Sequence, residues 1–159
     1  MDDTTLRRKD RALDREAALR ALDESLWGTL SMCAPDGTPY GCALHFVRDG
    51  ESLYFHAAKE GLKTELLRQN PRVCALFVRE ATVMEQKLTT HYVSVLVRGT
   101  AREITDGAEK CHALRLLCAK FAPSAAEHAE STIQSAAAHT AVWCVEITSV
   151  TGKANPLHS

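Results

Sequence analysis

The alternation of apolar and polar residues predicts a chain dominated by short β-strands. Strands are expected over 27–33, 40–47, 52–57, 73–78, 92–104 and 142–150. Two Asp-Gly pairs, Asp36-Gly37 and Asp49-Gly50, separate the first three strands, and such pairs are the strongest short-range signal for a hairpin. These three strands are therefore expected to form an antiparallel meander. Gly99, inside the fifth strand, predicts a bulge or a bend.

A helical period predicts four helices, over 14–24, 60–70, 106–121 and 124–138. Asp14 is the expected N-cap of the first, Asp106 caps the third, and a capping box starting at Ser124 opens the fourth. The polar segment 79–91 has no pattern that assigns it to an element. Tight hairpins in place of βαβ crossovers argue against a Rossmann-type fold. They favour a mainly β fold, a small β-barrel with flanking helices.

The 159 residues indicate one domain, 1–159, with a helical arm at 1–25 and a helical insertion at 106–138 before the last strand. A formal charge of −1 argues against a nucleic-acid partner. No apolar run of about 18 residues or secretory leader is evident, so no membrane partner and a cytoplasmic location are expected. Six scattered cysteines without a CxxC pair are expected to be free thiols, and no metal site is predicted.

The segment 53–64 carries the chemistry. A strand ends near His56, Gly61 follows in a loop, and Lys63 and Thr64 fall in the first turn of a helix. The unpaired N–H groups at a helix start favour an anion, and Lys59, Lys63, Thr64 and His56 add charge-assisted hydrogen bonds. The segment therefore predicts a site for one phosphate group. The alternative is a solvated face of two lysines beside a structural histidine.

Three runs, 36–40, 49–63 and 70–74, resemble a known family. They are similar to the pyridoxamine 5′-phosphate oxidase-related, FMN-binding split-barrel proteins, in particular the Nim-type (nitroimidazole-resistance) branch. The basic run 7–11, the run 91–95 and the closing run 151–153 fit the same branch. The resemblance covers residues 6–156. Its most specific feature is Tyr54-Phe55-His56-Ala57, followed by a Gly-x-Lys at 61–63 and an Asn-Pro-x-Val-Cys at 70–74.

This resemblance implies a homodimer of six-stranded antiparallel split barrels that holds FMN in two grooves at the subunit interface. Lys63 would contact the phosphate, the main chain of 41–44 would line the isoalloxazine ring, and Trp143 and Lys153 would come from the partner subunit. Position 62 is Leu where relatives commonly carry Arg. The implied cofactor contacts are Gly41, Cys42, Ala43, Leu44, His56, Ala57, Lys59, Leu62, Lys63, Thr64, Ser94, Trp143 and Lys153.

The implied activity is an FMN-dependent oxidoreductase that takes electrons from NAD(P)H and reduces a small electron-poor substrate such as a nitroaromatic. His56 would be catalytic, as a proton donor beside the flavin, unless it only binds a loop carbonyl. The alternative function is a non-catalytic flavin- or haem-binding carrier or sensor that uses the same groove, with His56 as an axial ligand to haem. His45 is expected to face solvent. Leu114, Leu117 and Phe121 are expected to be core residues.

Overall fold

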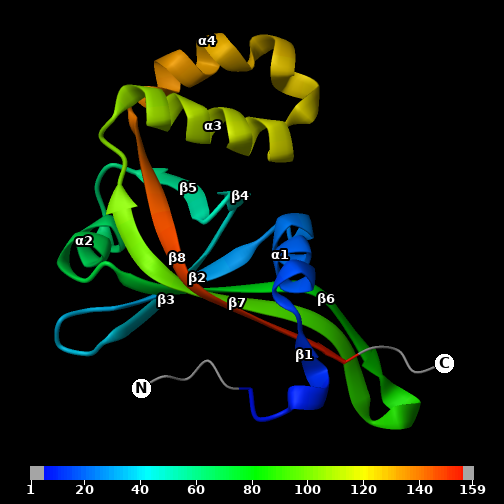
Figure 1. Cartoon of the computed structure of the whole chain (residues 1–159). Coiled ribbons are helices and arrows are strands. Elements are labelled where there is room, and N and C mark those ends of the chain that lie inside the picture. Colours follow the sequence, from blue (N-terminus) through cyan, green and yellow to red (C-terminus); the bar gives the residue numbers. More distant parts are fainter. Residues whose placement is uncertain (1–5, 156–159) are drawn as a thin grey trace.

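Eight antiparallel strands form one sheet in the computed structural model, which describes residues 6–155, without the side chains of 126–128 (Figure 1). The strand order is β3-β2-β6-β7-β8-β5-β4, and β1 pairs with β8. The six strands of six or more residues match the six predicted, and the sheet confirms the mainly β fold. Residues 1–5 of the expected arm, and residue 156 at the end of the family resemblance, lie outside the described part. The strands are β1 (Ala12–Leu13), β2 (Gly28–Cys33), β3 (Pro39–Leu44), β4 (Val47–Asp49), β5 (Ser52–Ala58), β6 (Arg72–Met84), β7 (Thr89–Glu103) and β8 (Thr140–Asn155).

The predicted meander is wrong, because the expected strand 40–47 breaks at His45-Phe46. Its first part, β3, pairs with β2, whereas the short β4 pairs with β5. Phe46 is 1% exposed, and its ring packs edge-on against Phe55 and Phe77 with centroids 5.4 Å away in both cases. Since β3 and β4 stand at opposite ends of the strand order, this two-residue link forces the sheet to curl into a barrel.

Both Asp-Gly turns are confirmed. Gly37 joins β2 to β3 with φ 91°, and Gly50 joins β4 to β5 with φ 56°, a region that favours glycine. The bulge predicted at Gly99 is also confirmed, because the β7–β8 register shifts between Arg98 and Gly99. A Cβ atom at Gly99 would lie 2.3 Å from the carbonyl oxygen of Glu146, so only glycine allows the two strands to come this close.

The unassigned segment 79–91 continues β6 and β7 into a long hairpin that projects beyond the barrel (Figure 1). It turns through a 3₁₀ helix, Glu85–Lys87. Val83 is 72% exposed and Leu88 is 94% exposed, and most of residues 79–88 are exposed on both faces of the hairpin. Such a ribbon buries neither face, so it has none of the alternation from which a strand is recognised.

Helices flank the barrel as predicted, and two further 3₁₀ turns, Lys9–Arg11 and Pro123–Ala125, accompany them. The side chain of Asp14 accepts the N–H of Ala17 at 2.7 Å, which confirms the first cap. The cap at Asp106 is confirmed in the same way, whereas the one predicted at Ser124 is wrong, since no side chain caps that helix. The helices are α1 (Arg15–Glu24), α2 (Leu62–Gln69), α3 (Gly107–Phe121) and α4 (Ala126–Ala137).

The apolar side chains form two clusters. The first fills the barrel, around Phe46, Phe55 and Trp143, and includes the buried face of α1. The second lies between α3, α4 and the outer face of β5 and β8, around Tyr54, Leu117 and Val142. The pair α3 and α4 therefore covers one end of the sheet, as Figure 1 shows. Within residues 6–155, no helix is long and apolar enough to span a membrane.

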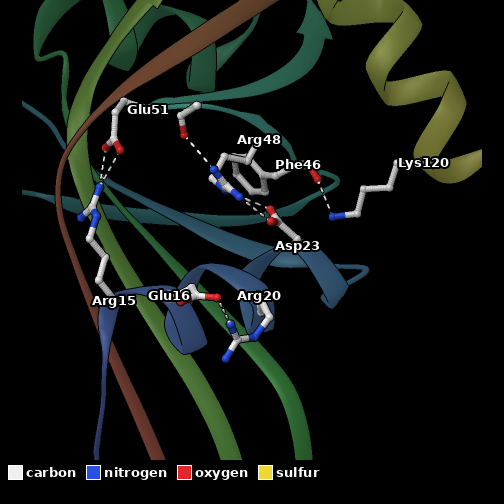
Figure 2. Close-up of polar contacts among 9 residues, drawn as sticks. Arg15, Glu16, Arg20, Asp23, Phe46, Arg48, Glu51 and Lys120 are labelled. Carbon is white, nitrogen blue, oxygen red and sulfur yellow. Dashed lines mark hydrogen bonds and ion pairs between the residues drawn. The ribbon is translucent and has the colours of Figure 1, made fainter.

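Polar contacts attach α1 to the β4–β5 hairpin and α3 to the link that precedes β4 (Figure 2). The Arg48 guanidinium donates to both carboxylate oxygens of Asp23 on α1, at 2.5 and 3.0 Å. From α3, the Lys120 ammonium donates to the carbonyl oxygen of Phe46 at 3.0 Å. The strand link that closes the barrel is thereby held by the insertion as well as by its own buried ring.

Candidate functional site

Three of the predicted site residues converge from separate elements: Cys42 on β3, His56 on β5 and Lys63 on α2. The Lys63 ammonium lies close enough to act on both of its neighbours. It helps to lower the pKa of His56, although burial is the larger cause and His45 adds to it. It opposes the effect of burial on Cys42, whose pKa is nevertheless raised. One cation thus sits beside an imidazole and a thiol at the start of α2.

The backbone at this point is shaped for an anion. Gly61 precedes α2 with φ 124°, and no side chain caps the helix. The first-turn N–H groups have no partner within an α-helix and carry its positive dipole end. Lys63 is half-buried and forms no ion pair with any residue in the described range 6–155. Its charge is therefore available at the helix start.

Two other predicted phosphate contacts are placed differently. Thr64 is 1% exposed, and its hydroxyl donates to the carbonyl oxygen of Ala58 at 3.1 Å, so it braces the loop before α2. The Lys59 ammonium donates to the carbonyl oxygen of Ala138, beyond the end of α4, at 2.5 Å. In this structure both side chains therefore contact carbonyl groups of the protein, and their role as ligands of a phosphate stays a prediction. Leu62 is 55% exposed at the first position of the helix.

The strand β3 offers main-chain groups at the edge of the sheet. Cys42 and Leu44 pack against the barrel core, whereas Gly41 and Ala43 are exposed on the outer face. Since β3 pairs with β2 on one side and ends the strand order, its other edge presents N–H and C=O groups to a ligand. This geometry suits recognition of a flat polar ring through the main chain of 41–44.

Ser94 and Lys153 lie directly opposite each other on β7 and β8. Ser94 also faces Val78 on β6, so the pair belongs to the outer sheet face that carries the exposed side chains of Val78 and Leu76. Both residues are half-buried. The predicted residues therefore fall into two groups, one around Lys63 and one on this outer face.

Trp143 belongs to neither group. It is 2% exposed, and its ring stacks at 7° on that of Phe55 inside the barrel, with centroids 6.4 Å apart. Its Nε1 is a buried donor without a hydrogen-bond acceptor among the described residues. The expectation that Trp143 reaches the flavin of a partner subunit is wrong, because its own barrel encloses the indole.

A cavity of about 260 Å³, which the sequence did not predict, lies between the barrel and the helical insertion. His45 and His56 line its barrel side. Leu114, Leu117 and Phe121 line the side of α3. The two leucines are core residues as expected, and Phe121 packs against that core, but all three also form this wall. Apolar helix faces give the same sequence signal whether they pack on a sheet or border a cavity, so no signal separates the two.

The expectation that His45 faces solvent is wrong. Its ring is held between Trp27 and Phe121, with centroids 3.7 and 4.4 Å away. Its Nδ1 lies 2.9 Å from the carbonyl oxygen of Leu26, which can only accept a hydrogen bond. His56, by contrast, makes no hydrogen bond with the described residues. The alternative in which His56 binds a loop carbonyl therefore has no support in this structure.

Comparison with known proteins identifies the family. Residues 14–154 match the model of the pyridoxamine 5′-phosphate oxidase family, so the chain belongs to this family and the resemblance is confirmed. Among curated proteins, none matches the sequence. A solved structure of a candidate 5-nitroimidazole antibiotic resistance protein from Bacteroides thetaiotaomicron has a TM-score of 0.75 and 23% identity, over 89% of this chain and 85% of that chain.

Two further solved structures share the fold. The flavocytochrome Anf3 from Azotobacter vinelandii has a TM-score of 0.81 and 22% identity, over 98% of this chain and 74% of that chain. An FAD- and haem-binding protein from Mycobacterium smegmatis has a TM-score of 0.76 and 20% identity, over 89% of this chain and 71% of that chain. At these identities the similarity establishes only the fold of the chain. The ligand has to be inferred from the residues of the site.

Proposed function

We propose that this chain is an FMN-dependent oxidoreductase that works as a homodimer. It takes electrons from NAD(P)H and reduces a small electron-poor substrate such as a nitroaromatic. The observation that carries the proposal is the convergence of Lys63, His56 and Cys42 at the uncapped start of α2. Membership of the pyridoxamine 5′-phosphate oxidase family, and the flavin-binding proteins among the similar structures, support it.

The residues present fit FMN. The Lys63 ammonium and the first N–H groups of α2 would hold the phosphate, and the free edge of β3 would face the isoalloxazine ring with main-chain groups of 41–44. Bound flavin would supply the electron-transfer chemistry, which no amino-acid side chain provides. The protein's own part is to orient the ring, to neutralise the phosphate and to handle a proton beside the ring.

His56 is the residue proposed to handle that proton. Its side chain lies on the exposed face of β5, and partial loss of hydration there, together with Lys63 and His45, lowers its pKa from the ordinary value. At neutral pH the ring is therefore uncharged, with one N–H group and one lone pair. A neutral imidazole can relay a proton, because its lone pair accepts one from water while its N–H group donates one to the reduced substrate.

The homodimer is supported by the outer face of β2, β3 and β6. Trp27 is 56% exposed, Val78 is 52% exposed and Leu76 is 41% exposed, and all three border one shallow hollow beside Ala43. Exposed apolar side chains that gather on one face are typical of a protein–protein interface. In such a dimer, the Ser94–Lys153 pair of one subunit would face the flavin held by the other.

A haem-binding carrier is the second candidate. One similar structure is that of a protein that binds both FAD and haem, and a neutral His56 suits an axial ligand. This function predicts a sharp Soret band, whereas flavin gives two broad bands in the blue and near ultraviolet.

The experiment is to record the absorption of the protein after incubation with excess FMN and desalting, and then to add NAD(P)H without oxygen. Retained flavin bands that bleach support the proposed enzyme. Retained bands that do not bleach, with a nitroaromatic acceptor also unreduced, support a non-catalytic flavin carrier, whereas a Soret band after incubation with haem supports the haem-binding carrier. A protein that is dimeric and folded yet retains no flavin contradicts the proposal.

A further inference from the structure

The cavity beneath the helical insertion has the size of a site for one substituted aromatic ring. Its volume is about 260 Å³. An apolar cavity of about 150 Å³ holds benzene, and sites for drug-sized ligands start at about 300 Å³. The space therefore exceeds an unsubstituted ring and falls short of a polycyclic ligand or a porphyrin.

The lining is asymmetric. Leu117 and Phe121 of α3 and Ile133 and Ala136 of α4 give it mostly apolar walls, and the two histidines lie on the barrel side. Two threonine side chains, Thr132 and Thr140, also border it. No Lys, Arg, Asp or Glu is found among the described residues that line it. A charged ligand would lose its hydration there without gaining an ion pair, which is costly. The lining therefore selects an uncharged molecule with one polar end.

His45 defines what that polar end must be. Because its Nδ1 faces the carbonyl oxygen of Leu26, Nδ1 carries the proton and Nε2 of the neutral ring keeps its lone pair. Within residues 6–155, no group donates to Nε2. The stacking of the ring between Trp27 and Phe121 fixes its orientation. Because His45 also lines the cavity, this acceptor is the one that the proposal assigns to a bound ligand.

We infer that this cavity binds small uncharged compounds with one aromatic ring and one hydrogen-bond donor, such as phenols, with the ring between α3 and α4 and the donor on His45. The insertion then determines the ring size that is admitted, with Ala136 as the residue that leaves room for it. The cavity shares His56 with the proposed flavin site, so a role as substrate pocket rests on the proposed function. The binding of the ring itself does not.

The test measures the binding of 4-methylphenol and of toluene by titration calorimetry, with and without FMN. We expect 4-methylphenol to bind roughly three- to tenfold more tightly than toluene, the effect of one hydrogen bond. Ala136→Phe fills the cavity and should weaken both ligands at least tenfold. Its matched control, Ser135→Phe, adds the same ring at an exposed position of the same helix and should leave both affinities unchanged.

His45→Phe keeps an aromatic ring between Trp27 and Phe121 and removes the acceptor. It should bring the affinity of 4-methylphenol down to that of toluene, and it gives an answer even if Ala136→Phe fails to fold. Equal affinities of the two ligands in the unmodified protein overturn the inference, as does unchanged binding in a folded Ala136→Phe. Either result leaves FMN binding at Lys63 intact, whereas loss of FMN binding alone contradicts only the proposed function.

Discussion

Replacement of Lys63 by alanine removes a cation that lies at the start of α2 and acts on both His56 and Cys42. In the proposed complex this ammonium makes a charge-assisted hydrogen bond to the FMN phosphate. Such a bond contributes about 1.5–3 kcal/mol. At 1.4 kcal/mol for each factor of ten, the expected loss is about 10- to 150-fold in FMN affinity.

The assay is a titration of the flavin-free protein with FMN, followed by the quenching of flavin fluorescence, at one fixed salt concentration. Lys59→Ala is the matched control, because that lysine lies four positions earlier but donates to the carbonyl oxygen of Ala138. It should bind FMN nearly as well as the unmodified protein. Size-exclusion chromatography of each variant separates a lost phosphate contact from a lost dimer.

A second readout does not depend on the cofactor. Since the Lys63 charge helps to lower the pKa of His56, its removal should raise that pKa, as measured by NMR titration of the imidazole protons. Full FMN affinity in Lys63→Ala would contradict a contact between this lysine and the phosphate. An equal loss of affinity in Lys59→Ala would contradict it as well, since the site would then be organised around a different cation.

Three further predictions concern stability, and urea unfolding measures each of them. The pKa of His56 is lowered in the folded state, so the unfolded chain binds more protons near the ordinary pKa, and the free energy of unfolding should rise from about pH 5 to pH 8. His56→Gln should flatten this rise. An unchanged slope in the variant would contradict the lowered pKa of His56. Gly99→Ala should cost about 1–3 kcal/mol, because its Cβ meets a backbone oxygen at the β7–β8 bulge; a neutral effect would mean that the strands can separate there. Lys120→Met keeps the aliphatic stem but removes the hydrogen bond to the carbonyl oxygen of Phe46. This loss should lower the free energy of unfolding by about 1 kcal/mol and speed amide hydrogen exchange in α3. Unchanged exchange would show that this contact does not hold the insertion.

Local signals in the sequence predict the strands, the turns and two helix caps well. In an Asp-Gly turn or an Asp cap, the interacting groups lie within four residues of each other, so a short stretch of sequence contains all the residues that determine the structure. The break at His45-Phe46 is different. Phe46 leaves the strand because Phe55 and Phe77 surround its ring, and those residues lie 9 and 31 positions further along the chain. The alternation of apolar and polar residues within 40–47 does not reveal packing against residues so far along the chain.

The candidate site was predictable in part for the same reason. The run from His56 to Lys63 is local, and the fold adds Cys42 from β3 to it. The side chains of Lys59 and Thr64 donate hydrogen bonds to the carbonyl groups of Ala138 and Ala58, which only the fold brings close. The burial of Trp143 depends on the closed barrel. The cavity beneath α3 and α4 depends on how two helices stand on the sheet. None of these contacts is encoded by spacing alone.

The most direct test of the proposed flavin site is the stoichiometry of FMN retained after incubation and desalting, determined from the absorption spectrum of the unmodified protein. We expect about one FMN per chain in a dimer, and much less in Lys63→Ala. Flavin bands that are absent from a folded, dimeric protein would contradict the proposed site, because the start of α2 and the edge of β3 would then not form a flavin site.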